Sequence, residues 1–131
     1  MQNLTIALVQ LEIIPNNPQK NLDNFANAMK DLQACDLIIL PEVFTTGFCS
    51  NARQYAERVD GTAYQWMAEQ ARKLNAVVTG SLVLKEGDAH LIVWFGCDRM
   101  PATRITINAI YFVWRVSMNA MRAAANVYWL N

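Results

Sequence analysis

The chain has 131 residues and a mass of 14.8 kDa, which is enough for one domain of ordinary size. Apolar residues make up 53% of it, so most of the chain can build a packed core rather than remain disordered. Eleven basic and eleven acidic side chains cancel, and there is no basic run. This balance excludes the electrostatic surface that nucleic acid or an anionic membrane would need.

The cysteines and the N-terminal residues predict a soluble cytoplasmic protein. Cys35, Cys49 and Cys97 are odd in number and form no CxxC pair, which favours a reducing compartment over a disulfide framework. The N-terminus has no basic region and carries Glu12 early, so no signal peptide is expected. No uncharged apolar run approaches the roughly 18–20 residues that span a bilayer.

The first elements are a strand, a helix and a second strand. Residues 4–11 are largely apolar and rich in strand-forming side chains. Asn17 is predicted to cap a helix that has Pro18 in its first turn. Apolar side chains then recur at helical spacing on one face: Leu22, Phe25, Ala26, Met29 and Leu32. Residues 36–40 form a second apolar strand, which Pro41 ends.

A second helix and a third strand follow a polar stretch at residues 45–61. Thr62 and Gln65 predict a capping-box start for the helix, and Asn75 is expected to end it. Its inward face would carry Trp66, Ala71 and Leu74, flanked by Met67. Residues 76–84 are the third strand, and the turn at residues 86–88 should lead into a hairpin partner. The order β-α-β-α-β predicts the α/β class, with buried parallel strands.

The composition changes at about residue 90. Residues 1–90 hold seven Lys or Arg and ten Asp or Glu, whereas residues 91–131 hold four Arg and one Asp. The second segment has no Lys, Glu or Gln, yet it has three of the four Trp. Soluble domains normally spread Lys and Glu over their whole surface. Within it, residues 91–95 and 105–113 are typical of strands and residues 117–126 of a helix.

Glu42 is the most informative polar side chain. It follows an apolar strand directly, and in open α/β sheets ligands bind beyond the carboxyl ends of the strands. A carboxylate that is partly desolvated there is suited to act as a general base. The spacing alone favours a structural role instead, in which the Glu caps a neighbouring helix or pairs with an Arg.

The run from Ile38 to Phe48, IILPEVFTTGF, closely resembles the segment that presents the catalytic glutamate in the nitrilase superfamily of carbon–nitrogen hydrolases. ALVQLEII and NPQKNLDNF resemble that family's first strand and helix, and Gly80-Ser81-Leu82 resembles its third strand. The likeness covers about 90 residues and is strongest to the ω-amidase branch, which hydrolyses the terminal amide of 2-oxo acids such as 2-oxoglutaramate. It implies a four-layer α-β-β-α sandwich, which is usually dimeric.

The resemblance also implies a mechanism in which Glu42 is the general base of a Glu-Lys-Cys triad. A Cys thiolate attacks the amide carbon while Lys and backbone N–H groups hold the oxyanion, and ammonia leaves as the thioester forms. Water then hydrolyses the thioester, and Glu42 transfers the protons in both steps. No metal or cofactor is needed, and the partner is a small-molecule amide.

The rest of that triad is missing from the 131 residues. The lysine is expected about seventy residues after the glutamate in a Y-x-K-x-H-L-F segment, but no Lys follows Lys85. The neighbours of Cys97 do not form the expected strand-to-helix elbow, and Cys49 and Cys35 are better explained as structural. His90 has no nucleophile in a recognisable motif and is expected in a surface turn. We therefore expect residues 1–90 to be the N-terminal part of the hydrolase domain, incomplete at the C-terminus and inactive alone.

Residues 91–131 are predicted to be an aberrant tail, read in a frame that is shifted just after His90. One such reading contains YNKRHLFRMAGEH, which resembles the family's missing lysine segment. The single codon of Trp94 before Phe95 forces Val in this reading, and that of Met118 before Asn119 forces Glu; both fit. The alternative is a divergent family member with an unusual tail.

Two other function classes remain open on the sequence. One is a non-catalytic binding or regulatory module that keeps part of the fold. The other is an unrelated α/β protein, such as a flavodoxin-like domain, in which Glu42 has no catalytic role. The first strand is not followed by a Gly-rich phosphate loop, which weighs against nucleotide or flavin binding.

Overall fold

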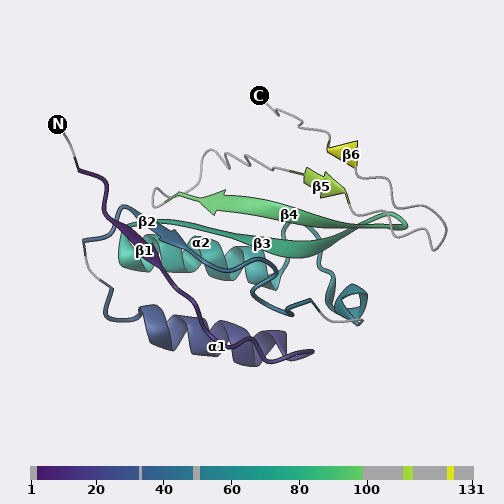
Figure 1. Ribbon diagram of the computed structural model, residues 1–131, viewed down its shortest axis with the longest axis horizontal. Coiled ribbons are helices and arrows are strands. Elements are labelled where there is room, and N and C mark those ends of the chain that lie inside the picture. The colour runs from purple at the N-terminus through teal and green to yellow at the C-terminus, as the bar shows by residue number, and fades with distance from the viewer. Residues whose placement is uncertain (1–2, 33, 49–50, 99–110, 114–123, 126–131) are drawn as a thin grey trace.

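The computed structural model describes residues 3–32, 34–48, 51–98, 111–113 and 124–125. They form one sheet in the order β1-β2-β3-β4-β5-β6 and the two helices α1 and α2 (Figure 1). The strands are β1 (Ile6–Leu8), β2 (Leu37–Ile39), β3 (Val77–Glu86), β4 (Ala89–Cys97), β5 (Tyr111–Val113) and β6 (Ala124–Ala125). The helices are α1 (Pro18–Met29), α2 (Thr62–Leu74) and the short 3-10 turn η1 (Ala52–Tyr55). The α/β class is confirmed.

The first three strands are parallel, as the β-α-β-α-β order predicts. β1 pairs with β2 with Ala7 opposite Ile38, and β2 pairs with β3 with Ile38 opposite Val78. Parallel neighbours need a crossover, and α1 and α2 supply the two crossovers here. The carboxyl ends of β1, β2 and β3 therefore point to the same edge of the sheet.

The turn after β3 leads into the expected hairpin. β3 and β4 pair antiparallel from Val78–Cys97 to Glu86–Ala89 without interruption. The predicted boundary at residue 90 lies within β4, where His90 stands opposite Lys85 rather than in a turn. The strand expected at residues 105–113 is described only as β5. Of the helix expected at residues 117–126, only Ala124–Ala125 is described, and these residues form strand β6, so the helix prediction is wrong there.

The predicted start of α1 is confirmed, and that of α2 is wrong in detail. Asn17 Oδ1 accepts a hydrogen bond from the Lys20 N–H at 3.2 Å, with Pro18 in the first turn. At α2, Gly61 is the N-cap and gives no side-chain bond. The Glu57 carboxylate instead accepts from the Ala63 N–H at 2.9 Å, and this negative charge at the amino end also suits the helix dipole. Asn75 ends α2 in the left-handed conformation, as expected.

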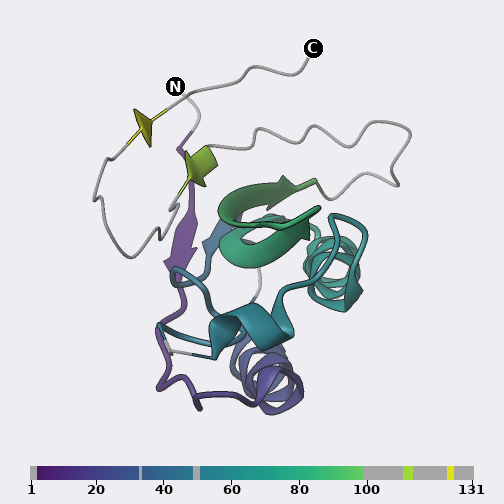
Figure 2. The ribbon, with the colours of Figure 1, turned by 90° about the vertical axis from the view of Figure 1, so that its right-hand side faces the viewer.

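Both helices pack on one face of the sheet. Their buried side chains meet those of the strands in one core: Leu22, Phe25, Met29, Ala63, Met67, Ala71, Ile38, Val78, Leu82, Val93 and Phe95. The predicted inward faces are confirmed, although Ala26, Leu32, Trp66 and Leu74 are only partly buried. Figure 2 looks along the two helices and shows them next to each other.

The sheet leaves an apolar edge exposed at β1. Leu4, Ile6 and Leu8 follow the strand period of two, and their exposed fractions are 64%, 48% and 76%. An edge strand with exposed apolar side chains favours association between chains.

Candidate functional site

Glu42 lies three residues beyond the end of β2, in the chain segment 41–47, which we call the elbow. The elbow leaves the carboxyl edge of the parallel strands, where the sequence predicts it. Glu42 is exposed, whereas the four residues that follow it, Val43 to Thr46, are buried. The partial desolvation expected of Glu42 is therefore not found in the part of the chain that the structure describes, and its catalytic role stays a prediction.

The backbone of the elbow is strained at the residue after the glutamate. Val43 has a φ of +49°, a left-handed conformation that a β-branched residue rarely adopts and that costs about 1–3 kcal/mol. Its carbonyl accepts hydrogen bonds from the N–H groups of Thr46, at 3.1 Å, and of Gly47, at 2.8 Å. Gly47 closes the turn with a φ of +66°, a conformation that favours glycine. Such strain persists only where the surroundings fix it.

Two buried polar side chains fix the elbow from either side. Ser81 of β3 accepts a hydrogen bond from the Val43 N–H at 2.8 Å through its Oγ. Asn21 of α1 donates from Nδ2 to the Thr45 carbonyl at 2.8 Å and also bonds both the N–H and the carbonyl of Ile14. Asn21 is 1% exposed and Ser81 is fully buried. The elbow is thus tied to β3, to α1 and to the loop before α1.

An aromatic anchor completes the elbow. Phe44 is fully buried, with its ring centroid 5.5 Å from that of Phe25 and 5.7 Å from that of Trp66. Gly80 makes room for it, because a Cβ there would lie 3.2 Å from the Phe44 ring and 3.0 Å from Leu40. The side chain of Phe44 therefore fixes the elbow to both helices and to β3.

The structure separates the other candidate residues from the elbow. Cys97 is buried at the end of β4 and belongs to the core, and Cys35 is partly buried against that core. Cys49 lies outside the described residues. His90 is partly exposed in β4. A structural role for Cys35 and Cys97 agrees with these positions.

Burial raises the pKa of the Cys97 thiol from its ordinary 9.0 to about 11, although Arg72 opposes this. The folded protein therefore holds the proton more tightly than the unfolded chain, and the stabilisation is present below pH 9 and lost as the pH rises from about 9 to 11. We expect the free energy of unfolding, measured with urea, to fall more steeply over this range in the native protein than in Cys97→Ala. Equal slopes would contradict the buried neutral thiol.

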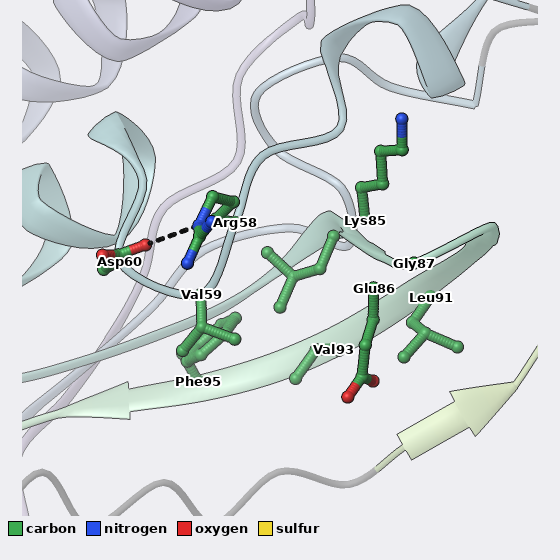
Figure 3. A pocket seen from close by; sticks show the side chains of 10 residues that line it. Arg58, Val59, Asp60, Lys85, Glu86, Gly87, Leu91, Val93 and Phe95 are labelled. Atoms are coloured by element: carbon green, nitrogen blue, oxygen red, sulfur yellow. Dashed lines mark ion pairs between the residues drawn. The ribbon is translucent and has the colours of Figure 1, made fainter.

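A cavity of about 570 Å³ lies between the loop before α2 and the β3–β4 hairpin (Figure 3). Its floor is apolar, with Leu91, Val93 and Phe95, and its rim carries charged side chains such as Arg58 and Asp60, whose ion pair is 3.6 Å long. Glu42 does not line it, and the described residues that do include no Cys, Ser, Thr or His. Among the described residues, the cavity therefore offers no thiol or hydroxyl nucleophile.

The described part of the chain offers neither a metal site nor a helix that could span a membrane. No three His, Cys, Asp or Glu residues among the described ones gather closely enough to hold a metal ion. Within the same residues, no helix has both the length and the apolar character that crossing a membrane requires.

Sequence reasoning found Glu42 but missed the groups that hold it. Asn21 lies beside Leu22 in the helical pattern, and only its place next to the buried stripe hinted that it is enclosed. Ser81 was the single hydroxyl within the apolar run 80–84, which is the signal of a buried hydrogen bond. Glu57 gave no local signal, because its partner Ala63 is fixed by the loop between them.

Comparison with known proteins places these features in a family. The sequence profile of the carbon–nitrogen hydrolases matches residues 5–112. Omega-amidase YafV of Yersinia enterocolitica is 32% identical over 88 residues, which are 67% of this chain and 34% of that protein. Omega-amidase YafV of Escherichia coli K12 is 32% identical over 85 residues, covering 65% of this chain and 33% of its own. The chain thus spans about a third of the length of these curated relatives.

Solved structures give the same likeness. XC1258 of Xanthomonas campestris, a CN-hydrolase superfamily protein, superposes with a TM-score of 0.75 at 32% identity, over 86% of this chain and 41% of that one. An amidase from Nesterenkonia sp. gives a TM-score of 0.62 at 26% identity, over 73% of this chain and 38% of that one.

Proposed function

Because the chain belongs to the carbon–nitrogen hydrolase family, we propose that it is the N-terminal part of an amidase that hydrolyses the terminal amide of a small 2-oxo acid. Glu42 is the general base in this proposal. The observation that carries it is the elbow, which holds Glu42 at the carboxyl edge of the parallel strands by a strained and heavily bonded backbone. The omega-amidase names of the curated relatives support the choice of substrate class.

The carboxylate can do base chemistry only if other groups complete the site around it. The proposed reaction needs a thiolate nucleophile and a lysine beside the oxyanion. Cys97 cannot serve, because its thiol is buried in the core with a raised pKa. Lys85 is the last lysine of the chain and lies on the rim of the separate cavity, not in the elbow. Residues beyond β4 in a complete domain would both supply these groups and enclose Glu42.

The 131-residue polypeptide alone is therefore expected to be inactive. Incubation of the purified chain with 2-oxoglutaramate should release no ammonia above the uncatalysed rate, whereas a full-length omega-amidase assayed beside it should. Turnover near that of the full-length enzyme would refute the proposed Glu-Lys-Cys chemistry for this chain. A cooperative melt together with no turnover would favour the alternative, a non-catalytic binding module.

We also propose that residues 91–131 arise from a shifted reading frame. The abrupt loss of Lys, Glu and Gln after residue 90 supports it. Two observations favour the alternative, a divergent chain in a single frame: the family profile extends to residue 112, and β4 pairs with β3 across the break. The gene's nucleotide sequence around the His90 codon decides between them. A second reading frame that encodes the lysine segment and, further on, a strand-to-helix turn with the cysteine supports the shift. A gene without such a frame excludes the shift.

We further propose that the complete protein is a homodimer and is located in the cytoplasm. Leu4, just before β1, and Ile6 and Leu8 within it are exposed apolar side chains, and contact with a second copy would bury them.

A further inference from the structure

We propose that Ser81 is a positioning residue for Glu42, acting through the backbone of the elbow. The inference rests on the proposed function, because a positioned carboxylate matters only if Glu42 takes part in catalysis. It concerns a hydrogen bond between segments 38 residues apart in the sequence, from the Val43 N–H to the Ser81 Oγ.

The bond lies where the regular β2–β3 pairing stops. The Leu40 N–H still donates to the Thr79 carbonyl of β3 at 2.8 Å. Glu42 follows two residues later, and the Val43 N–H then bonds to a side chain of β3 instead of a backbone carbonyl. The bond to Ser81 thus continues the attachment to β3 beyond the end of the backbone pairing. Glu42 lies between the two bonded residues, Leu40 and Val43.

The attachment controls a strained torsion angle. Val43 holds a φ of +49°, which a β-branched residue leaves readily when nothing fixes it. The peptide that carries the Val43 N–H also carries the Glu42 carbonyl, so rotation at this position reorients the glutamate's own backbone. Asn21 fixes the elbow only at Thr45, two residues further on. Ser81 is therefore the side chain that fixes the orientation at Glu42 itself.

Among the described residues, Ser81 Oγ is the acceptor of the Val43 N–H. Val43 is 1% exposed and Ser81 fully buried, so water does not reach the bond freely. Loss of an acceptor leaves a buried donor unsatisfied, which is unfavourable enough to drive local rearrangement. In Ser81→Ala the elbow is expected to open around Val43 and to leave Glu42 with several backbone orientations.

The test is amide hydrogen exchange and backbone relaxation by nuclear magnetic resonance on the intact 131-residue chain. In the native protein the Val43 amide is protected, and Ser81→Ala raises its exchange rate by about tenfold or more. The Leu40 amide, bonded to Thr79, keeps its rate and is the internal reference. The order parameter of the Glu42 amide falls from about 0.85 to below about 0.6.

Matched variants separate positioning from general stability. Thr79→Val removes another hydroxyl bond of β3, in which Thr79 Oγ1 donates to the Phe95 carbonyl at 2.6 Å, and should leave Val43 and Glu42 unchanged. Ser81→Thr keeps the acceptor oxygen and should restore the protection of Val43. Equal effects of Ser81→Ala and Thr79→Val would overturn the proposal. So would a Val43 amide that exchanges at the free-chain rate in the native protein, a result that needs no variant to fold.

These readouts do not depend on amidase activity. If a complete enzyme proves indifferent to Glu42, the proposed function fails, while the exchange data still report whether Ser81 holds the elbow. If Val43 is unprotected, the positioning role fails and the function of Glu42 is tested separately.

Discussion

Replacing Phe44 by alanine is expected to lower the free energy of unfolding by about 3–5 kcal/mol. The Phe44 ring is fully buried between Phe25 and Trp66, and it fills the space that Gly80 leaves open. Its removal takes away apolar contacts on three sides and leaves a cavity that the strained elbow cannot close without moving. Since small domains are stable by only about 5–15 kcal/mol, this single change removes a large share of the stability. Urea unfolding followed by circular dichroism measures it.

Phe48→Ala is the matched control for that experiment. It also replaces a phenylalanine by alanine, four residues further along the chain, but the Phe48 side chain is 77% exposed. Its effect should stay within about 0.5 kcal/mol. Similar losses for the two variants would mean that the elbow is not anchored to the core by Phe44.

The fold was predictable where local patterns decide it. The apolar runs and the helical spacing of Leu22, Phe25 and Met29 place the parallel half of the sheet and α1 correctly, because buried faces leave a periodic record in the sequence. The start of α2 could not be predicted in the same way. Gly61 is its N-cap, and the capping oxygen comes from Glu57, at the other end of a loop. A bond that depends on the path of a loop has no fixed spacing to detect.

In the candidate site, too, the features set by the local sequence were predictable and those set by distant elements were not. Glu42 was predictable because it follows an apolar strand and stands in a family motif. Its support by Asn21 and Ser81 was not, since these bonds join elements that are distant in sequence. The exposure of Glu42 was also missed, because whether a carboxylate is covered depends on what packs over it, and the sequence around residue 42 carries no record of that.

The second large effect concerns catalysis. In the protein that the proposed shifted frame after the His90 codon would encode, Glu42→Gln is expected to reduce kcat by about a hundredfold or more. The amide keeps the size of the side chain and removes its ability to accept and return a proton, which general base catalysis requires. Stability should change little, because Glu42 is exposed while the buried contacts of the elbow come from its neighbours.

The most direct measurement is the release of ammonia from 2-oxoglutaramate by the protein of that proposed frame, with Glu12→Gln as the control. Glu12 is also an exposed glutamate but precedes α1, outside the elbow. We expect native and Glu12→Gln proteins to have similar kcat values and Glu42→Gln to be nearly inactive, with unchanged unfolding curves for all three. Full activity of Glu42→Gln would contradict the assignment of Glu42 as the catalytic base.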